Sequence, residues 1–318
     1  MTRALEVRKI LSCKVNEANL HSYFIDFDID ENGDLTQMIN KFVHLLTEEI
    51  PSFALGYHQG KMVAQEDIFR ILTEAANSIY KIDAYEKVAQ TYLNGGFLKD
   101  DVADKYLRRG EFGELILHFI LKYFFNTLPL VAKIYFKDSF GHAVHGFDSV
   151  HINTQTNTLW LGESKLYRDG AKGIDALIED LFEHFNSNYF ESEFTIISKR
   201  IKDTKANLEE SGTNPEYWID LLNTYTKLSK KLDRIIIPMF CAYETNVFSK
   251  YNTSDFEKEY IEEIKKLNDR FIQKKSKHPW HQHLNIIVIL VPMESKKKLI
   301  SALHSKLKML QMLGGSDF

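Results

Sequence analysis

The sequence predicts a mixed α/β fold, in which helices flank a sheet of short apolar strands. Apolar residues make up 44% of the 318 residues, which is enough to bury a sizeable core. Segments with the period-two alternation of strands are interspersed with segments of helical spacing. Charged residues account for 26% of the chain, as in ordinary globular proteins. Together these observations predict a folded globular protein rather than a low-complexity chain.

The cysteine content and the terminal sequence exclude several classes of protein. Cys13 and Cys241 are the only cysteines, so a disulfide framework and a multi-cysteine zinc site are excluded. The first residues carry charges where a signal peptide needs an apolar run, and no segment approaches the roughly 20 apolar residues of a membrane span. We therefore expect a cytoplasmic protein with no membrane contact. The net charge of −4 is not the basic footprint of a typical nucleic-acid-binding protein, so such binding would need a locally basic groove.

The first 100 residues read as an α+β region of their own. Alternating apolar residues predict one strand, and two segments of helical spacing follow it. No proline- or glycine-rich linker separates this region from the rest, so its end near residue 100 is inferred from pattern alone. The expected elements are a strand at 20–30, a turn at Asn32-Gly33, a helix at 36–50 that ends before Pro51, and a helix at 64–92.

A more regular order of elements begins at residue 111. It runs helix, three strands, helix, strand, which is the core order of restriction-endonuclease-like folds. We therefore expect residues 101–318 to form a core of this type, with further strands and helices toward the C-terminus. The expected elements are a helix at 111–126, strands at 129–136, 143–153 and 158–167, an amphipathic helix at 174–185, a strand at 235–240, a helix at 254–275, a strand at 284–291 and a helix at 296–313.

The second and third of these strands are predicted to form a hairpin that brings two carboxylates together. With its turn at 155–156, Val150 faces Leu161, and the next pair on the same side is Asp148 with Glu163. Side chains alternate along a strand, and directly opposed residues lie close to each other. One end of an otherwise apolar face therefore carries two facing acids.

Lys165 lies on the same side of the hairpin, two residues beyond Glu163. Buried charges are costly, and two facing carboxylates repel each other. A divalent cation held by Asp148 and Glu163 would offset both effects, and oxygen ligands favour Mg²⁺ or Mn²⁺ over zinc. The backbone carbonyl of Ser164, between the two strand charges, is a further candidate ligand.

This arrangement predicts phosphodiester hydrolysis of the PD-(D/E)xK type. A metal at Asp148 and Glu163 can polarise a phosphate and activate water, and Lys165 can orient that water or stabilise the growing charge. A bare aspartate followed by a Glu-x-Lys motif is common by chance, and an ordinary hairpin with an exposed ion pair is the simple alternative. The position of the motif on two paired strands, after one helix and before another, favours the catalytic interpretation.

The helix at 111–126 offers one more acidic ligand. Glu111 and Glu114 lie on its polar side, and either could approach the metal. The alternative is a solvated helix face whose N-terminal acids favour the helix dipole. Glu114 is preferred because it lies deeper in the helix and directly precedes the apolar run.

Three motifs together resemble the HamA family of the Hachiman antiphage defence system. They are Gly110–Glu114, His145–Ile152 and Leu161–Tyr167, and the resemblance is closest over 110–185. It implies a PD-(D/E)xK effector that degrades DNA during phage infection, with a superfamily 2 helicase, HamB, as partner. By position, the catalytic set that the resemblance implies is Asp148, Glu163 and Lys165. Phe147 stands where the motif name has proline, a position that varies widely in the superfamily.

Two alternatives to a DNA-cleaving enzyme stay open on the sequence. The chain could be a catalytically inactive binding subunit that keeps the nuclease fold, although the intact Asp148, Glu163 and Lys165 set argues against decay. It could also be a nuclease directed at RNA, which the motif does not exclude.

Overall fold

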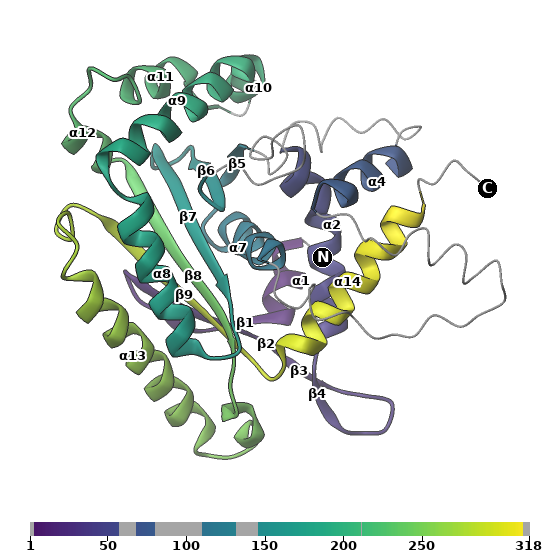
Figure 1. Ribbon diagram of the computed structural model, residues 1–318. Coiled ribbons are helices and arrows are strands. Elements are labelled where there is room, and N and C mark those ends of the chain that lie inside the picture. Colours follow the sequence, from purple (N-terminus) through teal and green to yellow (C-terminus); the bar gives the residue numbers. More distant parts are fainter. Residues whose placement is uncertain (1–2, 57–67, 80–109, 132–145, 211, 314–318) are drawn as a thin grey trace.

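A seven-stranded mixed sheet forms the centre of the computed structural model (Figure 1). The structure describes residues 3–56, 68–79, 110–131, 146–210 and 212–313. The strand order is β1-β2-β9-β8-β7-β6-β5, and β3 pairs with β4 in a separate ribbon. The strands are β1 Leu11–Asn16, β2 Leu20–Ile25, β3 Phe27–Ile29, β4 Leu35–Gln37, β5 Leu128–Val131, β6 Ser149–Asn153, β7 Thr158–Leu166, β8 Ile235–Glu244 and β9 Asn285–Met293.

The sheet combines an antiparallel and a parallel half. β5, β6 and β7 are antiparallel neighbours, whereas β7, β8, β9 and β2 run parallel to one another. Parallel neighbours need a crossover on a face of the sheet, which helices supply between β7 and β8 and between β8 and β9. The sequences of β8 and β9 are nearly all apolar because both faces of these strands are covered.

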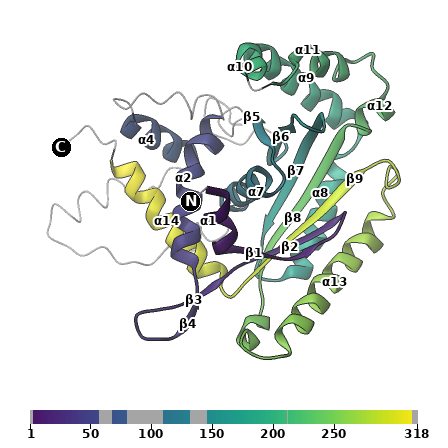
Figure 2. The same ribbon diagram turned by 180° about the vertical axis from the view of Figure 1, so that it is seen from behind.

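Helices cover both faces of the sheet and make three layers (Figures 1 and 2). α8 and α13 lie on one face, whereas α2, α7 and α14 lie on the other. The group α9–α12 gathers at one end of the sheet, near β5. In the described ranges, none of the helices combines the length and apolar character needed to cross a membrane. The helices are α1 Arg3–Ile10, α2 Ile39–Leu55, α4 Ile68–Ile79, α7 Glu111–Phe124, α8 Gly170–His184, α9 Ser187–Asp203, α10 Lys205–Glu210, α11 Pro215–Leu221, α12 Leu228–Leu232, α13 Phe256–Lys275 and α14 Lys296–Met312, with a 3₁₀ turn, η3, at Val247–Lys250.

Two apolar cores, one on each face of the sheet, follow the alternation of the strand residues. Leu159 and Leu161 of β7 point into the core under α8 and α13. Trp160 and Leu166 of the same strand point into the core under α2, α7 and α14. Because odd-numbered β7 residues face α8, Glu163 and Lys165 continue that row.

The first 100 residues share the sheet with the rest of the chain. β2 pairs in parallel with β9, and β1 pairs with β2 at the edge. α2 packs against α7 and α14. The N-terminal region thus extends the same sheet and covers the same face as α7.

The mixed α/β architecture predicted from the sequence is confirmed, with some boundaries in other places. The predicted strand at 20–30 is interrupted at Asp26, whose side chain accepts hydrogen bonds from Ser12, Tyr251 and the Phe27 amide. α2 does not end before Pro51 but continues to Leu55, because burial of its last turn outweighs the hydrogen bond that proline cannot donate. The parts of the predicted 64–92 helix beyond 68–79, and of the 129–136 strand beyond Val131, lie outside the described residues.

Close contact between α8 and β8 depends on a glycine. A Cβ added at Gly173 would overlap the sulfur atom of Cys241 in β8. Cys241 is fully buried, so the sulfur has little room to move. The short separation brings the C-terminal half of α8 against β7.

Substituting Gly173 with alanine is expected to destabilise the protein by about 1–3 kcal/mol, the usual cost of an overpacked core. Urea unfolding of the wild type and the variant measures the difference. The companion variant G173A/C241A removes the overlapping sulfur and should regain part of the loss. An unchanged urea midpoint for G173A alone would show that the contact between α8 and β8 can accommodate a methyl group.

Candidate active site

The hairpin of β6 and β7 has the register expected from the sequence. Val150 pairs with Leu161 and Ile152 with Leu159, as predicted. Asp148 directly precedes β6, in a bend, so it lies at the point where the two strands begin to separate. The alternation of apolar and polar residues was sufficient to predict this register, because a shift by one residue would turn the apolar residues of both strands to the other face.

Hydrogen bonds from Ser164 hold the Asp148 carboxylate against β7. Oδ2 of Asp148 accepts from the Ser164 backbone N–H at 2.8 Å and from the Ser164 hydroxyl at 2.9 Å. These two bonds take the place of the ladder contact that Asp148, lying outside the strand, does not make. The Asp148 carboxylate therefore lies beside Ser164, which directly follows Glu163 in β7.

Glu163 is the most deeply buried acid of the site, with 2% of its surface exposed. Its Oε1 shares a 2.7 Å hydrogen bond with Nδ1 of His184 in α8. Burial raises the pKa of Glu163 well above its usual range, and the nearby charges of Asp148 and Asp180 raise it further. Burial and the neighbouring acids therefore favour the neutral, protonated form of Glu163 when no cation is bound.

Lys165 reaches the same face and pairs with Asp180 in α8, with 2.5 Å between Nζ and Oδ2. Burial alone would lower the pKa of Lys165, but the hydrogen bond and charge of Asp180, with the charges of Asp148 and Glu163, raise it. Lys165 therefore carries a positive charge next to the two predicted ligands.

Asp180 and His184 are site residues that the sequence analysis did not identify. They lie one turn apart on α8, and Leu177 and Gly173 continue the same row toward its N-terminus. The row faces β7 and β8, so its last two positions meet Glu163 and Lys165. The sequence did contain a signal for these two residues: Asp180 and His184 are polar, yet they continue the row of α8 residues that faces the sheet.

The two predicted helix glutamates differ in their surroundings. Glu114 is buried, whereas Glu111, in the first turn of α7, is partly exposed. Gly113 faces β7, since a Cβ there would lie in ordinary contact, 3.4 Å from the Ser164 hydroxyl. The Glu114 charge contributes to the raised pKa of Glu163. Glu114 is thus within electrostatic range of the hairpin carboxylates, from the face opposite α8.

The start of α9 adds a tyrosine and a further acid next to the site. The ring of Tyr189 stacks on His184, with 4.6 Å between centroids and 18° between planes. Glu193 follows one turn later and is 2% exposed. Neither the Tyr189 hydroxyl nor Oε2 of Glu193 has a hydrogen-bond partner among the described residues. Burial raises the pKa of Tyr189, and the charges of Glu193, Glu163 and Asp148 raise it further.

Glu193→Gln is expected to remove a pH-dependent loss of stability. Burial raises the pKa of Glu193 from 4.5 to about 7. The folded state therefore holds this proton more tightly than the unfolded state, so stability is highest below pH 4.5 and falls as pH rises toward about 7. The difference corresponds to at most about 3 kcal/mol. Thermal unfolding at pH 5 and pH 8 should show a smaller difference for the variant, and an equal difference would contradict a buried, raised carboxyl.

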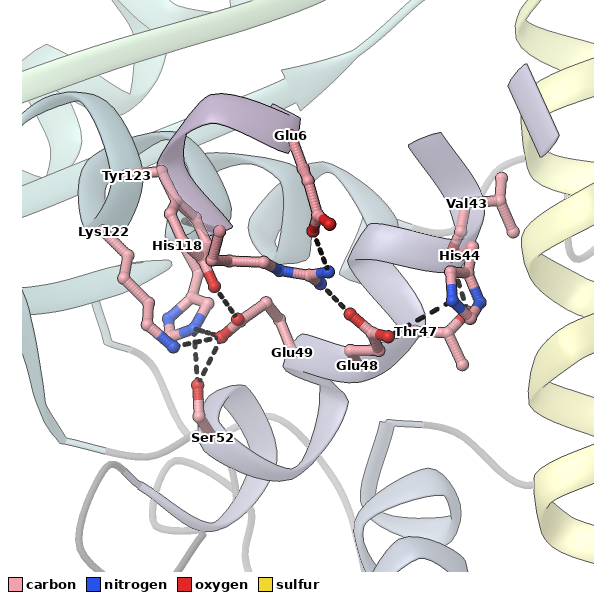
Figure 3. Close-up of polar contacts among 11 residues, drawn as sticks. Glu6, Val43, His44, Thr47, Glu48, Glu49, Ser52, His118, Lys122 and Tyr123 are labelled. Atoms are coloured by element: carbon pink, nitrogen blue, oxygen red, sulfur yellow. Dashed lines mark hydrogen bonds and ion pairs between the residues drawn. The ribbon is translucent and has the colours of Figure 1, made fainter. Parts of the chain in front are cut away.

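A second polar cluster lies on the α7 face and ties α2 of the N-terminal region to α7 (Figure 3). Glu49 of α2 accepts hydrogen bonds from Lys122, Tyr123 and Ser52. Burial alone would raise the pKa of Glu49, but His118 and Lys122 hold it well below its usual range. The cluster continues from Ser52 to His118 of α7, then to His151 of β6 and Thr127. These bonds link α2, α7 and β6 behind the candidate site.

In the described part of the chain, no group of three or more histidine, cysteine, aspartate or glutamate side chains is arranged to hold a metal ion. The hairpin site offers two carboxylates, and Glu114 of α7 lies within electrostatic range of Glu163. That number still suits Mg²⁺, which keeps several waters and commonly takes only one or two carboxylates from the protein.

Comparison with known proteins identifies the family. Among curated proteins, no relative matches the chain. The family model HamA matches residues 5–307, which include every residue of the candidate site. This is nearly the whole chain and extends well beyond the three motifs that first indicated the resemblance. The chain therefore belongs to the HamA family.

Proposed function

We propose that the protein is a metal-dependent nuclease of the PD-(D/E)xK type that hydrolyses phosphodiester bonds in DNA. One observation supports it most directly. Asp148, directly before β6, and Glu163 of the neighbouring strand β7 lie where these strands separate, and Lys165 lies beside them. Family membership suggests a component of the Hachiman defence system, and we propose that the nuclease is its DNA-degrading effector.

The donor set at the hairpin suits a divalent cation. The pKa of Glu163 is raised by burial and by Asp148, which is the repulsion that a bound cation would relieve. All the candidate donors are oxygen atoms, from Asp148, Glu163 and the Ser164 carbonyl. Glu114 is a further candidate ligand, also through oxygen. Such a set favours Mg²⁺ or Mn²⁺. When bound there, the ion supplies a Lewis acid for the phosphate and lowers the pKa of its water.

The remaining chemistry falls to side chains of this chain. Lys165 is cationic and lies next to Glu163, so it is placed to stabilise negative charge that develops on the phosphate. Asp180 pairs with Lys165 and orients its ammonium group. His184 holds Glu163 through Oε1 and thereby orients the carboxylate toward its ligand position.

We also propose that a helicase of the HamB type is the partner of this chain, because membership of the HamA family suggests a defence-system component that acts with a partner. The N-terminal region is our preferred contact for that partner, since it holds none of the proposed catalytic residues. Copurification of the two full chains, with and without substitutions in this region, tests the assignment. Undiminished complex formation by every such variant would move the contact elsewhere.

Cleavage assays on purified protein test the nuclease proposal. Labelled DNA and labelled RNA are incubated side by side with Mg²⁺, with Mn²⁺ and with a chelator, with and without the helicase partner. We expect DNA cleavage that the chelator abolishes. Cleavage of RNA alone would replace the proposed substrate with RNA. DNA binding without cleavage under all these conditions would favour an inactive subunit that keeps the fold.

A further inference from the structure

We propose that the aromatic ring of Tyr189 is a positioning residue for both predicted metal-binding carboxylates. The ring lies between two groups, each of which sets the position of one carboxylate. This inference rests on the proposed function for its catalytic meaning. Its geometry stands on contacts of the described residues.

The first contact reaches Glu163 through His184. The imidazole of His184 is packed on one side by the Tyr189 ring, nearly parallel, with 4.6 Å between centroids. Its Nδ1 shares the 2.7 Å hydrogen bond with Glu163. A ring that is stacked in this way has little freedom to rotate about χ2, so the direction of Nδ1 is set by the stack.

The second contact reaches Asp148 through its neighbour Phe147. The edge of one ring meets the face of the other, with 5.4 Å between the centroids of Tyr189 and Phe147 and 75° between their planes. Phe147 is buried and directly precedes Asp148. Asp148 lies outside β6, so the packing of Phe147 adds to the hydrogen bonds from Ser164 in anchoring this bend.

A local cap places Tyr189 in this position. Asn186 separates α8 from α9, and its Oδ1 accepts from the Tyr189 backbone N–H at 3.1 Å. Its Nδ2 donates to the Glu183 carbonyl at 2.7 Å. The same side chain thus binds the last turn of α8 and the first turn of α9. This N-cap holds Tyr189 in register with His184, which is in the turn it binds.

The ring, and not the hydroxyl, carries the effect. The Tyr189 hydroxyl is buried without a hydrogen-bond partner among the described residues, so it adds no contact that would hold His184. Removing it leaves both ring contacts in place. Phenylalanine at this position is therefore expected to preserve the arrangement, whereas leucine removes the stacking surface.

The test compares Tyr189→Leu with Tyr189→Phe in the full-length protein. DNA cleavage is measured over a range of Mn²⁺ concentrations. For Y189L we expect the half-saturating Mn²⁺ concentration to rise about 10-fold, the lower end of what loss of a group supporting a metal ligand costs. The rate at saturating Mn²⁺ should change much less. For Y189F we expect both values within about 2-fold of the wild type.

A matched control separates positioning from general loss of packing. Phe194 lies on α9, is more fully buried than Tyr189, and contacts Phe190 and Lys231, neither of which is a proposed site residue. Phe194→Leu removes a comparable aromatic ring and should lower the unfolding temperature without changing half-saturation by Mn²⁺. An unchanged Mn²⁺ half-saturation for Y189L, or an equal change for Y189F and Y189L, would overturn the proposal.

A second readout does not depend on cleavage. The ¹⁵N and ¹H resonances of the His184 ring in metal-free protein report its hydrogen bond to Glu163. We expect this signature in the wild type, Y189F and F194L, and its loss in Y189L. If the wild type cleaves no nucleic acid but Y189L alone loses the signature, the nuclease proposal fails while the positioning role stands. Retention of the signature in Y189L overturns the positioning role.

Discussion

Glu163→Gln is expected to reduce metal-dependent DNA cleavage by roughly 10²- to 10³-fold, because the proposed divalent cation would lose one of its two carboxylate ligands. The same change should leave the folded protein more stable at neutral pH. Glu163 has a pKa well above its usual range, mainly because it is buried. The contribution of Glu163 to stability is therefore present below pH 4.5 and is lost as pH rises. The neutral glutamine amide does not titrate, so the variant does not lose stability in this way.

The measurement pairs a plasmid cleavage assay with thermal unfolding at pH 7.5. Glu216→Gln is a matched control, since Glu216 lies in an exposed ion pair with Lys205 far from the hairpin in sequence. It should alter neither cleavage nor stability appreciably. Full cleavage activity in E163Q would remove Glu163 from the metal site, and a lower unfolding temperature would contradict a buried acid with a raised pKa.

Lys165→Met is expected to lower both activity and stability. Loss of the only cation that we assign to the developing phosphate charge should slow cleavage by about 10²- to 10³-fold, as for removal of one preorganised donor. The change also leaves Asp180 without its ion-pair partner. Asp180 is 15% exposed, so we expect a cost of about 2–3 kcal/mol, somewhat below that of breaking a fully buried pair.

The double variant K165M/D180N separates the two effects. Neutral asparagine has no charge to leave unpaired, so the double variant should recover most of the lost stability while cleavage stays low. Urea unfolding and cleavage at saturating Mg²⁺ are measured for wild type, both single variants and the double variant. Additive losses of stability in the double variant would show that the pair contributes nothing, and recovered cleavage would exclude a catalytic role for Lys165.

The sequence alone was sufficient for the parts of the structure that depend on local pattern. Period-two alternation predicted the pairing of Val150 with Leu161, and with it the approach of Asp148 to the Glu163 strand. Helical spacing located α7, α8, α13 and α14 to within a few residues. These predictions succeed because side-chain direction repeats every two residues in a strand and every 3.6 in a helix.

Tertiary packing determined the structure at positions where local sequence preference and burial favour different conformations. Pro51 ordinarily ends a helix, yet α2 continues because Phe53, Ala54 and Leu55 fill the core behind α7. The parallel pairing of β2 with β9 was equally absent from local pattern, since its partners are more than 260 residues apart along the chain. A pattern of neighbouring residues carries no information about which distant segments pair in the sheet.

The surroundings of the carboxylates are the clearest case. The sequence by itself determined that an aspartate, a glutamate and a lysine lie along one hairpin. Only the fold decided that Asp180 and His184 of α8 meet Lys165 and Glu163, and that Tyr189 stacks on His184. The physical reason is that these contacts arise from the packing of α8 and α9 against the sheet. The close contact at Gly173 and the cap by Asn186 set the positions of the two helices, and residue spacing along the chain does not predict those positions.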